Sequence, residues 1–108
     1  MGDNPLQLGE FEEIVLLAVA RLGDTAYGVT IRKEIEEVAK RDASYGALYT
    51  TLDRLEEKGY VSSRQGEATP ERGGRAKKYF KIEGKGVQAL HEAEARRMRL
   101  RSGLVLGF

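Results

Sequence analysis

The first half of the chain carries apolar residues at spacings of three and four positions, which is the period of amphipathic α-helices. Three segments show this pattern, over residues 8–22, 27–40 and 44–58. Their apolar stripes are Phe11, Ile14, Val15, Ala18 and Leu22 in the first, Tyr27, Ile31, Ile35 and Val38 in the second, and Leu48, Leu52 and Leu55 in the third. Ser44 is a suitable N-cap for the third segment, and Gly59 is a suitable residue to end it. The pattern predicts three helices joined by short polar turns.

The second half begins with two β-prone runs, residues 60–64 and 77–82. Between them, residues 65–76 are rich in glycine and contain Pro70, as expected of a turn. These features predict a β-hairpin with a long tip. A fourth helix is predicted over residues 83–102, followed by an apolar tail.

This order of elements indicates a mainly α fold with a small β-hairpin, arranged as helix, helix, helix, strand, strand, helix. It is the order of a winged helix-turn-helix domain, in which a helix enters the major groove of DNA and the hairpin, or wing, lies beside it. We divide the chain into a flexible N-terminal arm at residues 1–7, a winged-helix DNA-binding domain at 8–82, and a dimerisation helix and tail at 83–108.

Composition argues against several other classes of protein. A chain of 108 residues forms one domain, and it contains no cysteine and a single histidine, His91. We therefore expect no metal site, no cofactor and no catalytic triad, and the glycine-rich stretch at 73–78 lacks the phosphate-loop pattern. An enzyme is disfavoured. Without a long apolar run or a secretory signal, the expected location is the cytoplasm, with no membrane partner.

Charge is divided unevenly along the chain. Residues 1–43 hold five basic and nine acidic residues, a net charge of −4, whereas residues 44–108 hold 13 basic and eight acidic residues, a net charge of +5. Within residues 64–85, seven basic residues face three acidic ones. A basic wing directly after the third helix suits contact with DNA phosphates.

The expected DNA-binding residues lie at the front of the third helix and on the wing. Small and polar side chains occupy the first two turns of that helix, whereas its second half is acidic and would be repelled by DNA. The candidates are Ser44, Tyr45, Gly46, Tyr49, Thr50 and Arg54 from the helix, and Arg64, Arg72, Arg75, Lys77 and Lys78 from the wing. Two alternatives remain open: the two tyrosines could be half-buried packing residues, and the wing could dock an acidic protein partner instead of DNA.

The same residues resemble a family. The dipeptide Tyr27-Gly28, the stretch YGALYTTLDRLEEKGYV at 45–61 and GRAKKYF at 74–80 are similar to the PadR family of bacterial transcription regulators. The resemblance covers about residues 8 to 100. One departure is Glu83, where the family usually has a threonine that opens the last helix. The resemblance implies a homodimeric repressor of a neighbouring gene or operon, bound to double-stranded DNA at a palindromic operator.

The resemblance also implies dimerisation of the last helix against the first helix of the partner. Leu90, Ala93, Arg97, Leu100 and Leu104 follow spacings of three and four, as in a short coiled-coil seam. Leu16, Leu17 and Val19 lie off the first helix's apolar stripe, which predicts a second apolar surface there. The last helix could also close the protein's own core through Val87, Leu90 and Met98, and both arrangements can hold at once.

A small-molecule effector, often aromatic or phenolic in this family, is a further implication of the resemblance. The chain has no tryptophan to stack on a flat ligand. Phe11, Val15, Met98 and the apolar tail could line a cavity between subunits, although a place in the core is the simpler interpretation. His91 lies between glutamates and is interpreted as a surface or interface residue.

Overall fold

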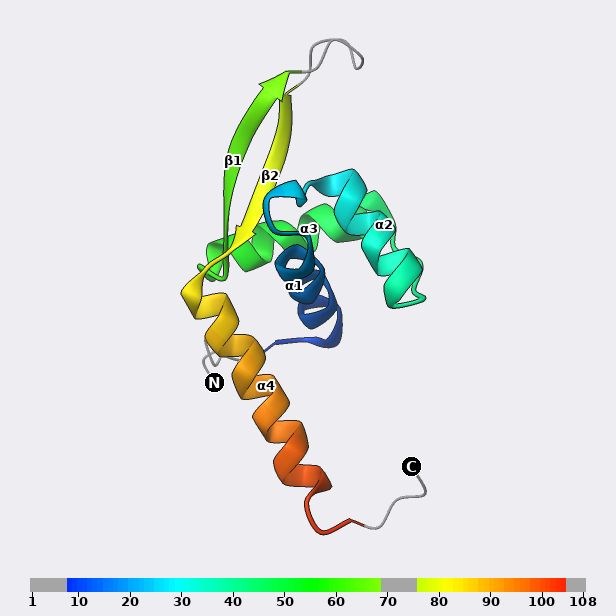
Figure 1. The fold of residues 1–108 in the computed structure, drawn as a ribbon, viewed down its shortest axis with the longest axis vertical. Helices are drawn as coiled ribbons and strands as arrows, with labels where there is room; N and C mark the ends of the chain where they lie inside the picture. The colour runs from blue at the N-terminus through cyan, green and yellow to red at the C-terminus, as the bar shows by residue number, and fades with distance from the viewer. Residues whose placement is uncertain (1–7, 69–75, 105–108) are drawn as a thin grey trace.

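The computed structural model describes residues 8–68 and 76–104, and it has the predicted winged-helix order (Figure 1). Three helices, α1 (Glu10–Leu22), α2 (Gly28–Val38) and α3 (Tyr45–Glu57), precede the hairpin of β1 (Val61–Ala68) and β2 (Ala76–Ile82), and α4 (Gly84–Arg101) follows. A short 3₁₀ turn, Gly23–Thr25, separates α1 from α2. The predicted N-terminal arm, the wing residues Arg72 and Arg75, and the end of the apolar tail lie outside the described residues.

Helix α1 is the centre of the core. It contacts α2, α3, β2 and α4, and Figure 1 shows it surrounded by these elements. The predicted stripe of α3, Leu48, Leu52 and Leu55, is fully buried against it. Leu16 and Val19 are also buried, with 0% and 1% exposure, so the prediction that they form a dimer surface is wrong. A central helix needs apolar residues around most of its circumference, because neighbours cover it on several sides. Only Leu17 of the three is exposed.

The ends of α3 follow the predicted capping residues. The Ser44 hydroxyl accepts a hydrogen bond from the Ala47 amide at 3.1 Å, as an N-cap does. Gly59 follows the helix with φ of +78°, a conformation that residues with a Cβ rarely adopt. By contrast, Val38 was predicted to face inward and is 53% exposed, because α2 ends there rather than at residue 40.

The hairpin is fastened to the turn before α2. Its strands pair antiparallel from Val61↔Ile82 to Gln65↔Lys78, and Tyr27 forms an isolated bridge with Tyr79. The Phe80 amide donates a 2.8 Å hydrogen bond to the Ala26 carbonyl. The base of the wing is therefore held against the start of α2 as well as against the core.

Helix α4 closes the core with its first half and leaves the domain with its second. Ala89 and Ala93 are buried and Leu90 packs against the core, whereas Val87 and Met98, predicted as core residues, are exposed. Ala93 is therefore a core residue of its own chain, not the free interface residue that was predicted. Figure 1 shows α4 extending away from the body, opposite the hairpin. None of the helices in the described ranges combines the length and the apolar character needed to cross a membrane.

Glu83 is held by the hairpin rather than by the helix that it precedes. It is the N-cap residue of α4 but makes no side-chain capping bond. Its carboxylate instead accepts a 2.5 Å hydrogen bond from the Ser62 hydroxyl of β1. Glu83 therefore joins the wing to the start of α4 through its side chain instead of capping the helix.

Candidate nucleic-acid interface

The front of α3 presents the predicted polar surface. Tyr45 and Tyr49 are 40% and 42% exposed, and Gly46 and Thr50 are exposed beside them. The alternative in which the two tyrosines are half-buried packing residues stays open, because each ring is partly covered by the protein and partly exposed. The Ser44 hydroxyl accepts a hydrogen bond as the N-cap, but it can still donate its proton to a ligand at this exposed end of the helix. Several hydrogen-bonding groups thus lie together in the first two turns of the helix.

The two tyrosines are stacked and held from α2. Their ring centroids are 6.2 Å apart with an interplanar angle of 23°. The Arg32 guanidinium of α2 lies 4.7 Å from the Tyr45 ring centroid, and its Nε donates a 2.8 Å hydrogen bond to the Ala43 carbonyl just before the N-cap. Arg32 Nη2 also forms an ion pair with Glu36 Oε1 on the same helix, at 3.2 Å. Arg32, which was not among the predicted site residues, therefore fixes the α2–α3 turn and supports the tyrosine stack.

A second cluster of tyrosines and cations lies on one face of the wing. Tyr27 and Tyr79 have ring centroids 5.4 Å apart. Lys77 Nζ lies 4.5 Å from the Tyr27 ring centroid, and the Arg64 guanidinium lies 4.7 Å from that of Tyr79. The predicted site residues Arg64 and Lys77 are thus brought together and held on aromatic supports, as cation–π pairs are.

The other predicted cations lie elsewhere. Lys78 points to the opposite face of the hairpin, where its Nζ is 3.7 Å from Glu56 of α3. The Ser63 hydroxyl donates to the same carboxylate at 2.6 Å. Arg54 is exposed on the second half of α3, beyond the tyrosine stack. Part of the acidic charge of α3 is therefore neutralised within the protein.

Tyr27 and Tyr79 were missing from the predicted site. Alternation along residues 77–82 puts Tyr79 on the same strand face as Lys77, so its position was accessible to pattern analysis. Tyr27 was assigned to the inner face of the second helix, but it is the N-cap of α2 and only half-buried. No local pattern could bring it next to Tyr79, because their contact depends on how the hairpin folds back.

A partly buried ion pair holds the rear end of α3. Lys58 Nζ donates to Glu12 Oε2 at 2.8 Å, and the Gly9 amide donates to Glu12 Oε1 at 2.8 Å. Burial acts to raise the pKa of Glu12, but these hydrogen bonds and the nearby positive charges outweigh it and hold the pKa below its ordinary value of 4.5. The carboxylate therefore ties the start of α1 to the end of α3, which fixes the angle of the candidate recognition helix.

An ion pair joins α4 to α1 on the outer side. Arg97, predicted as a seam residue between subunits, pairs through both Nη atoms with the Glu13 carboxylate of its own chain. The hydrogen bond to Glu13 raises the pKa of Arg97 further above its ordinary value. The guanidinium thus aligns α4 on α1 within one chain.

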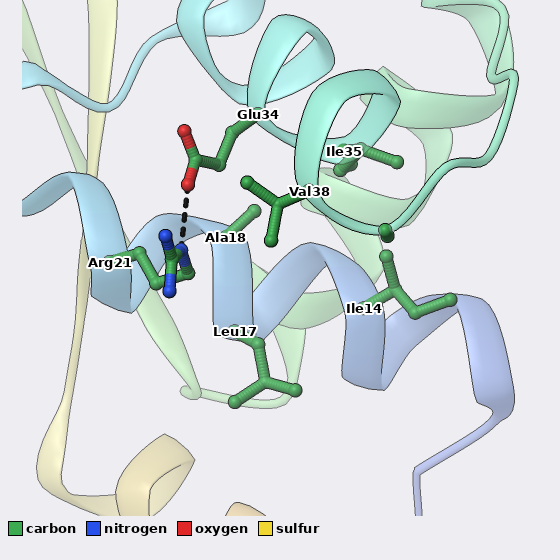
Figure 2. A pocket seen from close by; sticks show the side chains of 8 residues that line it. Ile14, Leu17, Ala18, Arg21, Glu34, Ile35 and Val38 are labelled. Carbon is green, nitrogen blue, oxygen red and sulfur yellow. Dashed lines mark hydrogen bonds and ion pairs between the residues drawn. The ribbon is translucent and has the colours of Figure 1, made fainter.

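An apolar groove of about 330 Å³ lies between α1 and α2. Figure 2 shows Ile14, Leu17 and Ala18 from α1 facing Ile35 and Val38 from α2, with Arg21 and Glu34 joined by a 2.6 Å ion pair at one end. The exposed Leu17 and Val38 lie on this groove. Among the described residues, no group of three or more His, Asp or Glu side chains is arranged to bind a metal ion.

Solved structures of transcription regulators have the same fold. A PadR-like transcription factor from Bacteroides fragilis is 31% identical, with a TM-score of 0.73 over 84% of this chain and 82% of that one. A PadR family regulator from Clostridium difficile is 23% identical, with a TM-score of 0.63 over 83% of this chain and 88% of that one. Bacillus subtilis PadR in complex with operator DNA is 18% identical, with a TM-score of 0.69 over 94% of this chain and 53% of that one.

The sequence comparison gives the same assignment. No curated protein matches the chain significantly, but the model of the transcriptional regulator PadR-like family matches residues 16–92. That span begins within α1 and includes α2, α3, the wing and the first half of α4. The chain belongs to the PadR-like family of transcriptional regulators, which are DNA-binding proteins rather than enzymes.

Proposed function

We propose that this protein is a homodimeric repressor that reads a palindromic operator with the front of α3 and grips the DNA backbone with the wing. The observation that carries the proposal is the exposed, stacked pair Tyr45 and Tyr49 on the first two turns of α3. Partly exposed phenol rings can contact base edges and thymine methyl groups in a major groove. The operator complex of Bacillus subtilis PadR, whose fold is shared, supports this use of the fold.

The wing supplies the sequence-independent part of binding. Arg64 and Lys77 lie on one face of the wing. Their charged groups are held there by contacts with the rings of Tyr79 and Tyr27, respectively. Each phosphate that such a cation neutralises releases counterions from the duplex. We propose that this face follows the DNA backbone, with Arg72 and Arg75, between the two strands in sequence, as further contacts.

Selection from random duplexes tests the function directly. The full chain should enrich an inverted repeat whose half-sites are about one helical turn, roughly 34–36 Å, apart, because two α3 helices of a symmetric dimer meet successive major grooves on one side of the duplex. Enrichment of a single half-site would contradict the dimeric arrangement. Recovery of no sequence, with retention of an acidic protein partner instead, would favour the interaction-module alternative.

Replacing Arg64 by alanine should reduce the salt dependence of DNA binding. The slope of log affinity against log salt concentration should become shallower by about 0.9 for each subunit's lost phosphate contact. Fluorescence anisotropy on one operator between 50 and 300 mM salt, a range of roughly sixfold, measures the slope. Lys33→Ala on the outer face of α2 is the matched control and should leave it unchanged. Equal slopes for all three proteins would exclude the wing from backbone contact.

We further propose that the dimer forms between the exposed end of α4 and the α1–α2 surface of a second copy. Met98, Leu100 and Leu104 are 58%, 78% and 58% exposed, so the described part of their own chain leaves most of these side chains uncovered. The α1–α2 groove offers apolar side chains, including Leu17, and acidic residues lie on both of its helices. Both surfaces therefore expose apolar side chains, as the two sides of a subunit interface do.

Repression and its release complete the proposal. A dimer bound across a promoter excludes the transcription machinery, and a small molecule that changes the spacing of the two α3 helices would release it. The subunit interface is the proposed location of an effector, since Leu17 and the end of α4 are exposed there. Val15 and Phe11, considered for such a cavity, are respectively buried in the core and covered by Arg41.

A further inference from the structure

Tyr49 reaches from α3 onto the first residue of α2. A Cβ atom added to Gly28 would lie 2.0 Å from the Tyr49 Oη and 2.8 Å from its Cζ. Both distances are far below any van der Waals contact between these atoms. The end of the phenol ring therefore occupies the space that a side chain at position 28 would fill.

The ring is confined from its other side as well. Tyr45 stacks on it at 6.2 Å, and Arg32 of α2 holds Tyr45 in turn at 4.7 Å. Gly28 and Arg32 are one turn apart on α2, so this helix supports the tyrosine pair at both ends. Within the described ranges, the Tyr49 hydroxyl makes no hydrogen bond to the protein, so its proton can be donated to a ligand.

We propose that Gly28 is a positioning residue for operator recognition. Because it has no side chain, the end of the Tyr49 phenol packs directly on the start of α2, and this contact sets the direction of the ring. The inference deepens the proposed function and depends on it. Ordering a long side chain before binding removes part of the conformational entropy that association would otherwise cost. A tyrosine seated in this way would contact a base edge in one direction only, which favours specificity over general affinity.

The substitution Gly28→Ala separates positioning from folding. The three atoms nearest to an added Cβ all belong to Tyr49, and they lie at the far end of an exposed side chain that can rotate outward. Alanine is also the better helix former, by up to about 1 kcal/mol where the position is inside a helix. The variant should therefore be at least as stable to heat as the parent, while its operator affinity falls about tenfold.

A double-mutant cycle with Tyr49→Ala isolates the contact. Gly28→Ala should weaken operator binding when Tyr49 is present and have no effect in the Tyr49→Ala background, because the ring that it displaces is then absent. Gly84→Ala is the matched control: Gly84 is the first residue of α4 as Gly28 is of α2, and a Cβ there meets nothing within 4 Å. Gly84→Ala should leave the operator affinity unchanged, both when Tyr49 is present and in the Tyr49→Ala background.

Two results would overturn the inference. One is an equal loss of affinity from Gly28→Ala in both backgrounds, and the other is unchanged affinity when Tyr49 is present. Binding is measured on the operator returned by duplex selection and on a scrambled duplex, and the ratio of the two affinities should fall in Gly28→Ala. A wild-type chain that binds no duplex would refute the proposed function instead, so the two failures are distinguishable.

Discussion

Replacing Leu100 by glutamate should separate the dimer into monomers and weaken operator binding by about two to four orders of magnitude. Leu100 is 78% exposed in the single chain, so the substitution leaves the core of each subunit intact. In the proposed dimer Leu100 is buried against the partner's apolar α1–α2 groove, and a glutamate would place an unpaired charge there. Two linked half-site contacts would become two independent ones, and the gain from effective concentration would be lost.

Sedimentation or light scattering, combined with operator titration, measures both parts of this prediction. The matched control is Gln88→Glu, which adds one negative charge at an exposed position on the same helix. It should leave the dimer and its affinity unchanged. A Leu100→Glu protein that remains dimeric would place the interface elsewhere, and one that is monomeric but binds the full operator normally would show that dimerisation does not support recognition.

Replacing Glu12 by alanine should lower the free energy of unfolding by about 2 kcal/mol at neutral pH. The change removes a hydrogen bond from Lys58 and one from the Gly9 amide, both at 2.8 Å, and hydrogen bonds to a charged group are worth about 1.5–3 kcal/mol each where they are buried. It also leaves the Lys58 ammonium, which is only 27% exposed, without its carboxylate. Denaturant unfolding at a fixed protein concentration measures the loss.

The same carboxylate should make stability depend on pH in a defined direction. Its pKa is lower in the folded protein than its ordinary value of 4.5. The stabilisation is therefore complete above pH 4.5 and is lost as the pH falls through the lower, folded pKa. Glu12→Gln should flatten this acid limb of the stability profile. Glu10→Gln, at an exposed surface pair with Arg41, is the control and should change little. Identical acid limbs for parent and Glu12→Gln would show that the ion pair contributes nothing to folding.

The order and type of the elements could be predicted from the sequence, because they depend on local patterns. Helical spacing identified the buried leucines of α3, and Ser44 and Gly59 marked its ends. Exposed polar residues in its first two turns identified Tyr45 and Tyr49. The basic composition of the predicted wing identified Arg64 and Lys77 as candidates, together with Lys78, which lies on the opposite face. Each of these features is set by neighbours within a few positions, where backbone geometry alone decides which side chains share a face.

Contacts between distant segments could not be predicted in the same way. Leu16 and Val19 were expected at a dimer interface and lie in the core, because a periodic pattern shows which positions are apolar but not which element covers them. The seat that Gly28 provides for Tyr49, the pairing of Tyr27 with Tyr79 and the Lys58–Glu12 bridge all join residues far apart in the chain.

The sequence by itself therefore determined the helices, the hairpin, their polar faces and the family resemblance. Only the tertiary structure decided that α1 is a central helix, that α2 supports the tyrosines of α3, and that the last turns of α4 remain uncovered within the described part of the chain. The physical reason is that hydrogen bonding and periodicity act along the chain, whereas packing chooses among apolar faces of similar hydrophobicity by shape, and shape exists only once the chain has folded.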